Sequence, residues 1–138
     1  MKKITIVIDM QNDFLTGTLA NPDAVSIIPS VLNQIKNADY VMYTRDTHEE
    51  NIYFETQEGK NLPVEHCIKD TDGWQIQSEL DALRKEEAID KPTFGSVALG
   101  QLLKAYDTYE EKRLTSCYFR AFRCRQRHHL QGISQNPR

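Results

Sequence analysis

The pattern of apolar and polar positions changes repeatedly along the first 111 residues, and each change predicts an element. Runs of apolar and β-branched residues predict buried strands over residues 4–9 and 40–46, and a shorter run predicts a third strand over residues 86–91. Each run ends on a charged side chain, in chain order Asp9, Asp46 and Lys91. A charged group at the end of a buried strand either caps the next segment or takes part in chemistry.

Apolar residues at helical spacing lie between and after these strands. The first helix is predicted from Val25, Ile28, Leu32 and Ile35. Asp23 is placed to cap it, and Pro29 predicts that the helix starts after the proline or bends there. Two more helices are predicted over residues 74–85 and 96–106. Residues 47–75 are polar and contain Pro and Gly breakers, so they are predicted to form a loop.

This alternation of strand and helix predicts an α/β protein: a three-layer α/β/α sandwich with a mostly parallel, Rossmann-like sheet. In such sheets, ligands bind beyond the carboxyl ends of the strands. Asp9, Asp46 and Lys91 all lie at predicted carboxyl ends, so we expect them to converge on one crevice.

Charge divides the chain in two. Residues 1–111 hold 10 Lys and Arg against 20 Asp and Glu, whereas residues 112–138 hold 7 Lys and Arg and no acid. The second segment also lacks a clear strand or helix period. We therefore expect one domain over residues 1–111, followed by an atypical basic tail over residues 112–138.

Composition excludes some classes of protein. No apolar run approaches the roughly 20 residues that a membrane-spanning helix needs. The N-terminal run is interrupted by Asp9 and is not followed by a small-residue cleavage site, so it predicts a strand rather than a signal peptide. The three cysteines are too few and too scattered for a disulfide framework, which favours a reducing, cytoplasmic compartment: Cys67, Cys117 and Cys124.

Several residue types suggest chemistry before any relative is considered. Asp46 and His48 place two metal-ligand types on one extended segment, and His66 would close a site; exposed histidines are the alternative. Asp9 and Lys91 also have ordinary alternatives, as a loop cap and a solvated side chain.

The aromatic side chains of Phe14 and Trp74 would suit the wall of a pocket, but core packing explains them as well. Cys67 adjoins His66, yet neighbours in an extended segment point apart, so it is not expected to be a nucleophile.

Four motifs in series carry a resemblance to a known family: VIDMQNDF, TRDTH, LPVEHC and DKPTFGS. In this order and spacing they resemble the isochorismatase-like cysteine hydrolases, which include the nicotinamidases, over roughly residues 3–111. The resemblance implies the α/β/α fold, which would be incomplete at its C-terminal end here. It also implies hydrolysis of a C–N bond in a small-molecule amide, and it raises the expectation of a homo-oligomer.

The resemblance also implies roles for individual residues. Asp9 and Lys91 match the aspartate and lysine of an Asp-Lys-Cys triad, in which an acid and a nearby cation would generate a thiolate. Asp46, His48 and His66 match the ligands of a divalent metal, commonly zinc, in nicotinamidase-like members. Glu58 is the candidate for their fourth ligand, at an imperfect spacing. Isochorismatase-like members lack this metal.

The resemblance does not extend to the segment that carries the family's nucleophile. The family's cysteine motif is not recognisable after Glu111; Cys124 is the candidate by position and Cys117 the next. One hypothesis is that residues 112–138 are an out-of-frame or truncated end, which would leave the chain inactive. A competing hypothesis is a non-catalytic chain whose basic, aromatic tail binds nucleic acid or an acidic partner, with nucleic acid the less expected partner.

Overall fold

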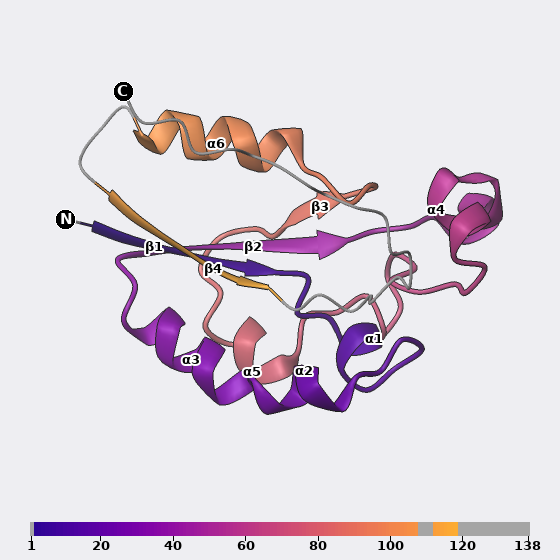
Figure 1. The fold of residues 1–138 in the computed structure, drawn as a ribbon, viewed down its shortest axis with the longest axis horizontal. Helices are drawn as coiled ribbons and strands as arrows, with labels where there is room; N and C mark the ends of the chain where they lie inside the picture. The colour runs from indigo at the N-terminus through magenta and orange to yellow at the C-terminus, as the bar shows by residue number, and fades with distance from the viewer. Residues whose placement is uncertain (1, 108–111, 119–138) are drawn as a thin grey trace, which may run out of the picture.

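The structure, a computed structural model, describes residues 2–107 and the backbone of residues 112–118 (Figure 1). In this part of the chain, four parallel strands form one sheet in the order β3-β2-β1-β4. Their bounds are Lys2–Ile8 for β1, Tyr40–Asp46 for β2, Ile89–Lys91 for β3 and Lys112–Tyr118 for β4. The register pairs Ile8 with Thr44 of β2 and with Tyr118 of β4, so these strands end close to the same level.

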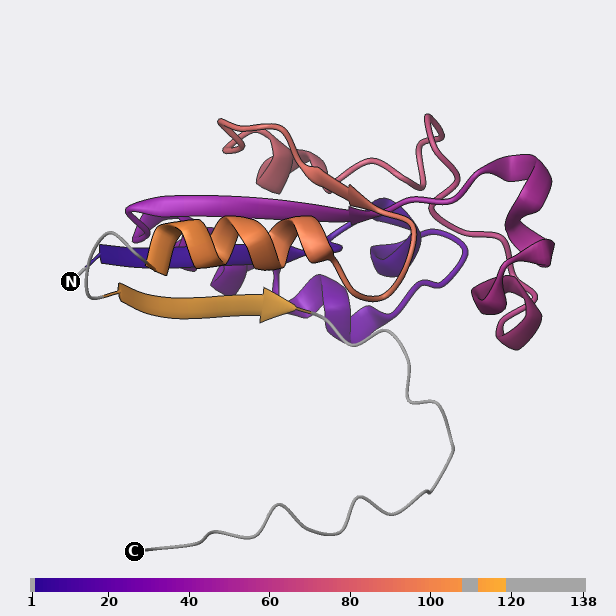
Figure 2. The same cartoon turned by 90° about the horizontal axis from the view of Figure 1, so that it is seen from above.

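Helices cover both faces of the sheet (Figures 1 and 2). One face carries α2 (Pro22–Ser26), α3 (Ile28–Lys36) and α5 (Ser78–Asp81), and the other carries α6 (Val97–Asp107). The short elements α1 (Asn12–Leu15), η1 (Glu50–Glu55) and α4 (Gln57–Asn61) lie beyond the carboxyl ends of the strands. This arrangement confirms the predicted α/β/α class.

Alternation along the two central strands divides the core between the layers. Ile4, Ile6 and Met42 are buried on the α6 side, where Leu99, Leu103 and Tyr106 of that helix pack against them. Val7 and Tyr43 are buried on the opposite side against α3 and α5, whose buried contributions are Val31, Ile35 and Leu80. Burial on both faces explains why these strands show continuous apolar runs in the sequence.

The first predicted helix is two helices, because the chain bends between Ser26 and Ile28. Pro29 lies in the first turn of α3, where its missing N–H costs no helical hydrogen bond. The expected cap is wrong: Asn21, not Asp23, caps α2, and its side-chain oxygen accepts a hydrogen bond from the Asp23 N–H at 2.9 Å.

Two other predicted segments differ from the structure. The loop predicted over residues 47–75 contains η1 and α4, and the helix predicted over residues 74–85 is reduced to the four residues of α5. The second difference has a tertiary cause: the backbone around Ile76 pairs with Gln11, and the Gln77 N–H donates to the carbonyl of Met10. Residues 74–77 therefore extend along Met10 and Gln11, in the segment that follows β1, instead of forming a helical turn.

Part of the segment after Glu111, which shows no clear strand or helix period in the sequence, forms the strand β4. All seven residues of β4 pair in parallel with β1. A polar segment can form such a strand because its backbone hydrogen bonds need no particular side chains. Cys124 and the rest of residues 119–138 lie outside the described residues, and Cys117 lies within β4.

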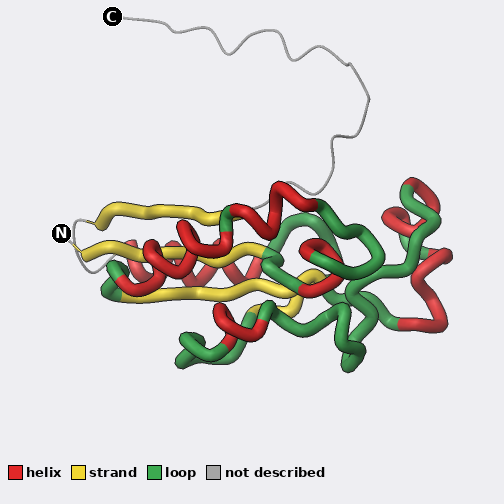
Figure 3. Tube along the Cα trace, turned by 90° about the horizontal axis from the view of Figure 1, so that it is seen from below, coloured by secondary structure: helices red, strands yellow, loops and turns green. Residues whose placement is uncertain are grey.

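The connections that follow the strands gather at one end of the sheet, where Figure 3 shows long loops between short helices. No helix in the described part of the chain is long and apolar enough to cross a bilayer.

Candidate active site and metal centre

Asp9 and Lys91, from separate strand ends, meet at the carboxyl edge of the sheet. β1 ends at Ile8, and Asp9 adopts a left-handed backbone conformation with φ 52° that turns the chain out of the sheet. The Asp9 N–H donates to the Thr44 carbonyl at 3.2 Å, and the Thr44 hydroxyl donates to Asp9 Oδ1 at 2.7 Å. Lys91 Nζ lies 2.6 Å from Asp9 Oδ2. Lys91 is only 4% exposed, so this is a largely desolvated ion pair.

Two opposing effects act on the Asp9 carboxyl. Burial raises the pKa of Asp9 above its ordinary value, and the attraction and hydrogen bond of Lys91 oppose that rise. An acid with a raised pKa holds a proton more readily than an exposed aspartate does. The arrangement therefore provides a carboxyl group suited to accepting and returning a proton beside a buried cation.

Four side chains form a second cluster next to this pair: Asp46, His48, Glu58 and His66. One ligand atom from each lies within 4.8 Å of the others. Asp46 Oδ2 is 3.1 Å from His48 Nε2 and 3.4 Å from His66 Nε2. The Glu58 carboxylate lies 3.8 Å from His48 Nε2 and 3.6 Å from His66 Nε2. Lys91 Nζ is 3.8 Å from Asp46 Oδ1, so the cluster and the ion pair adjoin.

The cluster fits a divalent metal. Asp46 Oδ1 and Glu58 Oε2 are buried and have no hydrogen-bond partner among the described residues. Unpartnered buried carboxylate oxygens are costly unless a cation or water meets them. Two imidazoles with two carboxylates are also a donor set that suits zinc and related transition metals.

The helix α4 brings Glu58 into the cluster. Sequence reasoning selected Glu58 in spite of its imperfect spacing, and placed it in a loop. The Thr56 hydroxyl caps α4 by accepting from the Gly59 N–H at 3.0 Å, and the turn between η1 and α4 directs Glu58 back toward β2. A Cβ at Gly59 would lie 2.0 Å from the Tyr53 carbonyl, so this turn requires a glycine.

Electrostatics within the cluster favour opposite charges on Asp46 and His66. Burial alone would raise the pKa of Asp46, but hydrogen bonds from His48 and His66 and the charge of Lys91 lower it well below its usual range. Burial alone would lower the pKa of His66, but its hydrogen bonds to Asp46 and Glu58 raise the pKa to about 10.

Tyr53 supports His66 and was not identified from the sequence. Its side chain is fully buried, with its hydroxyl 2.8 Å from the Leu62 carbonyl and 3.2 Å from His66 Nδ1. His66 Nδ1 also lies 2.8 Å from the Val64 carbonyl. These contacts leave His66 Nε2 facing the cluster. An aromatic residue in a segment predicted to be a loop was the only sequence signal for Tyr53.

Asp13, the second carboxylate after β1, is a structural anchor. Its Oδ2 accepts from the Cys67 N–H at 2.7 Å, and its Oδ1 accepts from both the N–H and the hydroxyl of Thr18 at 3.1 Å. A Cβ at Gly73 would lie 2.2 Å from this carboxylate, so Gly73 is needed for the close approach. Asp13 thus fixes the backbone directly after His66.

Cys67 is not placed as a nucleophile, although the geometric reason expected from the sequence is wrong. Its backbone is left-handed, with φ 47°, rather than extended. The side chain is fully buried, and burial, together with the neighbouring carboxylates, raises the pKa of its thiol. A thiol that resists ionisation is a poor nucleophile.

Phe14 and Trp74 are both buried, in one cluster with Cys67. Phe14 also contacts His66, with ring centroids 5.6 Å apart. The Trp74 indole N–H donates to the Thr47 hydroxyl at 2.8 Å, and the Arg45 guanidinium stacks on the ring at 3.6 Å from its centroid. Both aromatics therefore pack beneath the site.

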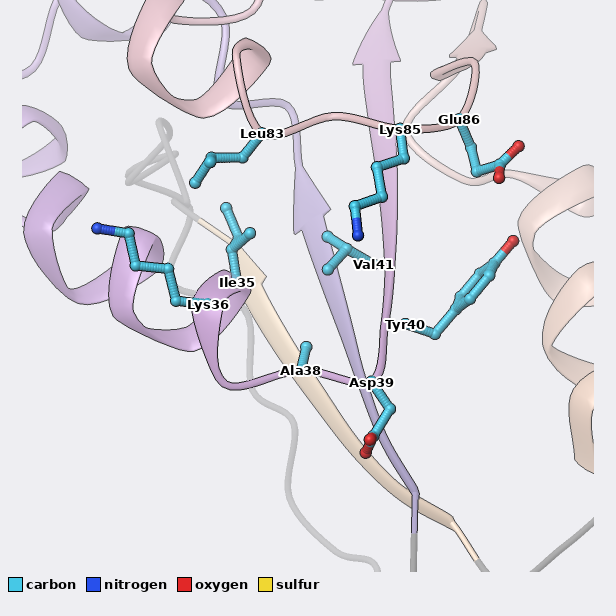
Figure 4. A pocket seen from close by; sticks show the side chains of 9 residues that line it. All are labelled: Ile35, Lys36, Ala38, Asp39, Tyr40, Val41, Leu83, Lys85 and Glu86. Carbon is cyan, nitrogen blue, oxygen red and sulfur yellow. The ribbon is translucent and has the colours of Figure 1, made fainter.

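Lys91 lies on the wall of an open hollow of about 620 Å³, formed with Asp90, Pro92, Thr93 and residues 95–98 at the start of α6. A second cavity, of about 250 Å³, lies at the opposite, amino end of β2 and is lined by Tyr40, Leu83 and Lys85 among others (Figure 4). The first adjoins the ion pair, whereas the second lies far along the sheet from it.

The fold and the site together define a parallel α/β/α protein with a buried acid–ammonium pair beside a candidate metal cluster. The family model described as the isochorismatase domain matches residues 3–114. The chain belongs to this hydrolase family, as the resemblance predicted. No curated protein sequence matched the chain.

Solved structures agree with this assignment. The nicotinamidase/pyrazinamidase of Bacillus subtilis aligns with a TM-score of 0.63 and 25% identity, over 85% of this chain and 72% of that one. The pyrazinamidase of Pyrococcus horikoshii, solved in complex with zinc, aligns with a TM-score of 0.59 and 27% identity, over 86% and 72%. The N-carbamoylsarcosine amidase of Thermoplasma acidophilum, at 22% identity, TM-score 0.60 and coverage of 84% and 68%, shares the fold.

Proposed function

We propose that this chain carries the catalytic framework of an amidase that hydrolyses the C–N bond of a small amide through a cysteine thioester. The 2.6 Å contact between Lys91 Nζ and Asp9 Oδ2, buried at the carboxyl edge of the sheet, carries this proposal. A nicotinamide-like amide is the favoured substrate, because zinc-bound pyrazinamidase is among the similar structures. An isochorismate-type vinyl ether is the second candidate.

In this mechanism, Asp9 accepts the proton of the attacking thiol, and Lys91 stabilises the charges on both groups. The sulfur forms a bond to the amide carbon. The C–N bond then breaks as Asp9 returns the proton to the departing nitrogen. Water hydrolyses the resulting thioester, which releases the acid and restores the thiol.

Asp46, His48, Glu58 and His66 would hold the divalent metal, with zinc the favoured ion. Bound there, the metal would polarise the ring nitrogen of a nicotinamide-like substrate. The unpartnered oxygens of Asp46 and Glu58 support this assignment.

The proposed nucleophile is Cys124, with Cys117 as the alternative. β4 supports a nucleophile in this region, because its last residue, Tyr118, pairs with Ile8, the residue before Asp9. The hypothesis of an out-of-frame end remains a proposal, and it predicts that this polypeptide is inactive. Sequencing the gene across codons 108–138 tests it: an absence of the family's cysteine motif in every shifted frame contradicts the hypothesis.

Ammonia release from nicotinamide tests the function. If the chain is active, Asp9→Ala, Lys91→Ala and Cys124→Ser each abolish turnover, because each removes one member of the proposed Asp-Lys-Cys triad. Asp23→Ala and Lys104→Ala are matched controls, since both residues are exposed and belong to neither the ion pair nor the metal cluster, and both should retain wild-type rates. Full activity in Asp9→Ala or Lys91→Ala removes the triad assignment; loss in Cys117→Ser alone moves the nucleophile to Cys117.

We also propose a reducing, cytoplasmic location and a homo-oligomeric state, on the cysteine content and the family resemblance. Sedimentation velocity of the purified chain measures its oligomeric state directly.

A further inference from the structure

The side chain of Gln11 makes three hydrogen bonds beside the site, and the mechanism above does not use it. The residue is fully buried. Its Oε1 accepts from the Asp46 N–H at 2.7 Å, and its Nε2 donates to the Asp46 carbonyl at 2.8 Å and to the Trp74 carbonyl at 2.9 Å. One amide thus satisfies both backbone polar groups of Asp46 and joins that residue to the segment after Gly73.

This pattern replaces a missing piece of the sheet. β1 would normally continue beside β2 and bond the backbone of Asp46. The left-handed turn at Asp9 takes β1 out of the sheet just before that point, after the Asp9 N–H has met the Thr44 carbonyl. The side chain of Gln11 then supplies the donor and the acceptor that the strand no longer offers, because a primary amide has the same two functions as a peptide group.

The Asp46 carboxylate lies close to both groups of the site. It lies 3.1 Å from His48 Nε2, 3.4 Å from His66 Nε2 and 3.8 Å from Lys91 Nζ. It is therefore shared between the metal cluster and the Asp9–Lys91 pair.

We infer that Gln11 is a positioning residue, which holds the backbone of Asp46 so that its carboxylate can serve the metal cluster and Lys91 together. The inference rests on the proposed metal site. It assigns Gln11 no contact with substrate or metal.

Gln11→Met tests this role, because methionine has a similar size and makes none of the three hydrogen bonds. Tyr43→Phe is the matched control. It removes one buried hydrogen bond of β2, the strand that contains Asp46: the 3.0 Å bond from the Tyr43 hydroxyl to the Leu80 carbonyl, which lies away from the site. Zinc affinity of the full chain is measured by calorimetry with zinc ion alone, at a temperature where both variants are folded by circular dichroism.

We expect the zinc dissociation constant to rise about 10–100-fold in Gln11→Met, as for loss of a group that orients a metal ligand. Tyr43→Phe should keep the wild-type value even where its stability falls. An unchanged zinc affinity in Gln11→Met, or an equal loss in Tyr43→Phe, overturns the inference. If Gln11→Met does not fold, Gln11→Glu, which keeps the acceptor and loses both donors, is used with the same expectation.

Amide hydrogen exchange separates failure of this inference from failure of the metal proposal. If the wild-type chain binds no zinc, the metal proposal fails, and the exchange of the Asp46 N–H still tests Gln11. That amide should exchange as slowly as those within β2 and become faster in Gln11→Met or Gln11→Glu, but not in Tyr43→Phe. Exchange of the wild-type Asp46 N–H at the rate of exposed loop amides overturns the inference.

Discussion

Charged side chains are buried at the carboxyl edge because each has a specific partner. Lys91 is 4% exposed and Asp46 is 4% exposed, values that would be costly for isolated ions. Lys91 is paired with Asp9, and Asp46 accepts from two histidines. Two buried oxygens among the described residues have no hydrogen-bond partner: Asp46 Oδ1, 3.8 Å from Lys91 Nζ, and Glu58 Oε2, 3.8 Å from His48 Nε2.

Zinc binding is predicted at the residue scale. One zinc ion should bind the wild-type chain, raise its melting temperature and lose affinity on His48→Ala, since the imidazole supplies a ligand that alanine cannot replace. Differential scanning calorimetry, with and without a chelator, measures the melting temperature.

His128→Ala is the control for this experiment, because it removes a histidine from the basic segment and leaves the cluster complete. A melting temperature that does not respond to zinc in the wild-type chain contradicts the metal assignment. Loss of binding in the control instead places the zinc in the C-terminal segment.

The element that carries Lys91 is short. β3 has only three residues, and its register places Arg45 opposite Asp90 and Asp46 opposite Lys91. Arg45 forms two hydrogen bonds to the Asp90 carboxylate, at 2.7 and 3.1 Å, and stacks on Trp74. These contacts of Arg45 with Asp90 and Trp74, which we call the clamp, compensate for the few backbone hydrogen bonds of so short a strand.

Arg45→Lys should therefore loosen β3, because lysine can neither form the paired hydrogen bonds nor stack on the indole. We expect a loss of about 1 kcal/mol in the free energy of unfolding, the upper range for a partly exposed pair. Faster exchange of the Thr47 N–H, which donates to the Lys91 carbonyl at 2.9 Å, should accompany it. Urea unfolding and hydrogen-exchange spectroscopy make the two measurements.

Arg84→Lys is the matched control for the clamp. Arg84 pairs with Asp81 at 2.7 Å within one turn of chain, and this local contact holds no strand in place. Equal effects of Arg45→Lys and Arg84→Lys on the Thr47 amide would show that the clamp does not stabilise β3.

At the scale of the molecule, β4 bears on the boundary expected after residue 111. The strand places residues 112–118 in the same sheet as β1. A chain that ends at Glu111 would leave the long hydrogen-bonding edge of β1 exposed, which favours edge-to-edge association.

A chain ending at Tyr118 should consequently aggregate less through the edge of β1, and unfold more cooperatively in urea, than a chain ending at Glu111. Sedimentation velocity and urea unfolding of the two truncations check this. Equal stability and equal association of the two chains would support the boundary at residue 111.

The competing hypothesis for the basic segment has its own prediction. Residues 112–138 carry 7 Lys and Arg and no acid, so nucleic-acid binding by this segment would weaken steeply with added salt. Fluorescence anisotropy with a short RNA would show such binding in the full chain and none in the chain ending at Tyr118. Binding that survives the truncation, or that ignores salt, contradicts this hypothesis.

The sequence by itself determined the class of fold, the family and the residues that meet at the carboxyl edge. Strands buried on both faces have a strong local signal, and Asp9, Asp46 and Lys91 directly mark where those strands end. The spacing of four motifs was sufficient to indicate the family.

Only the tertiary structure decided the segments whose conformation depends on distant partners. Residues 74–77 have a helical pattern but pair with the segment that follows β1, and β4 has no clear pattern but pairs with β1. Gln11 and Tyr53 could not be identified because their roles consist of contacts with residues far along the chain. Local periodicity records which face of an element is buried, whereas these contacts exist only after the elements have been brought together.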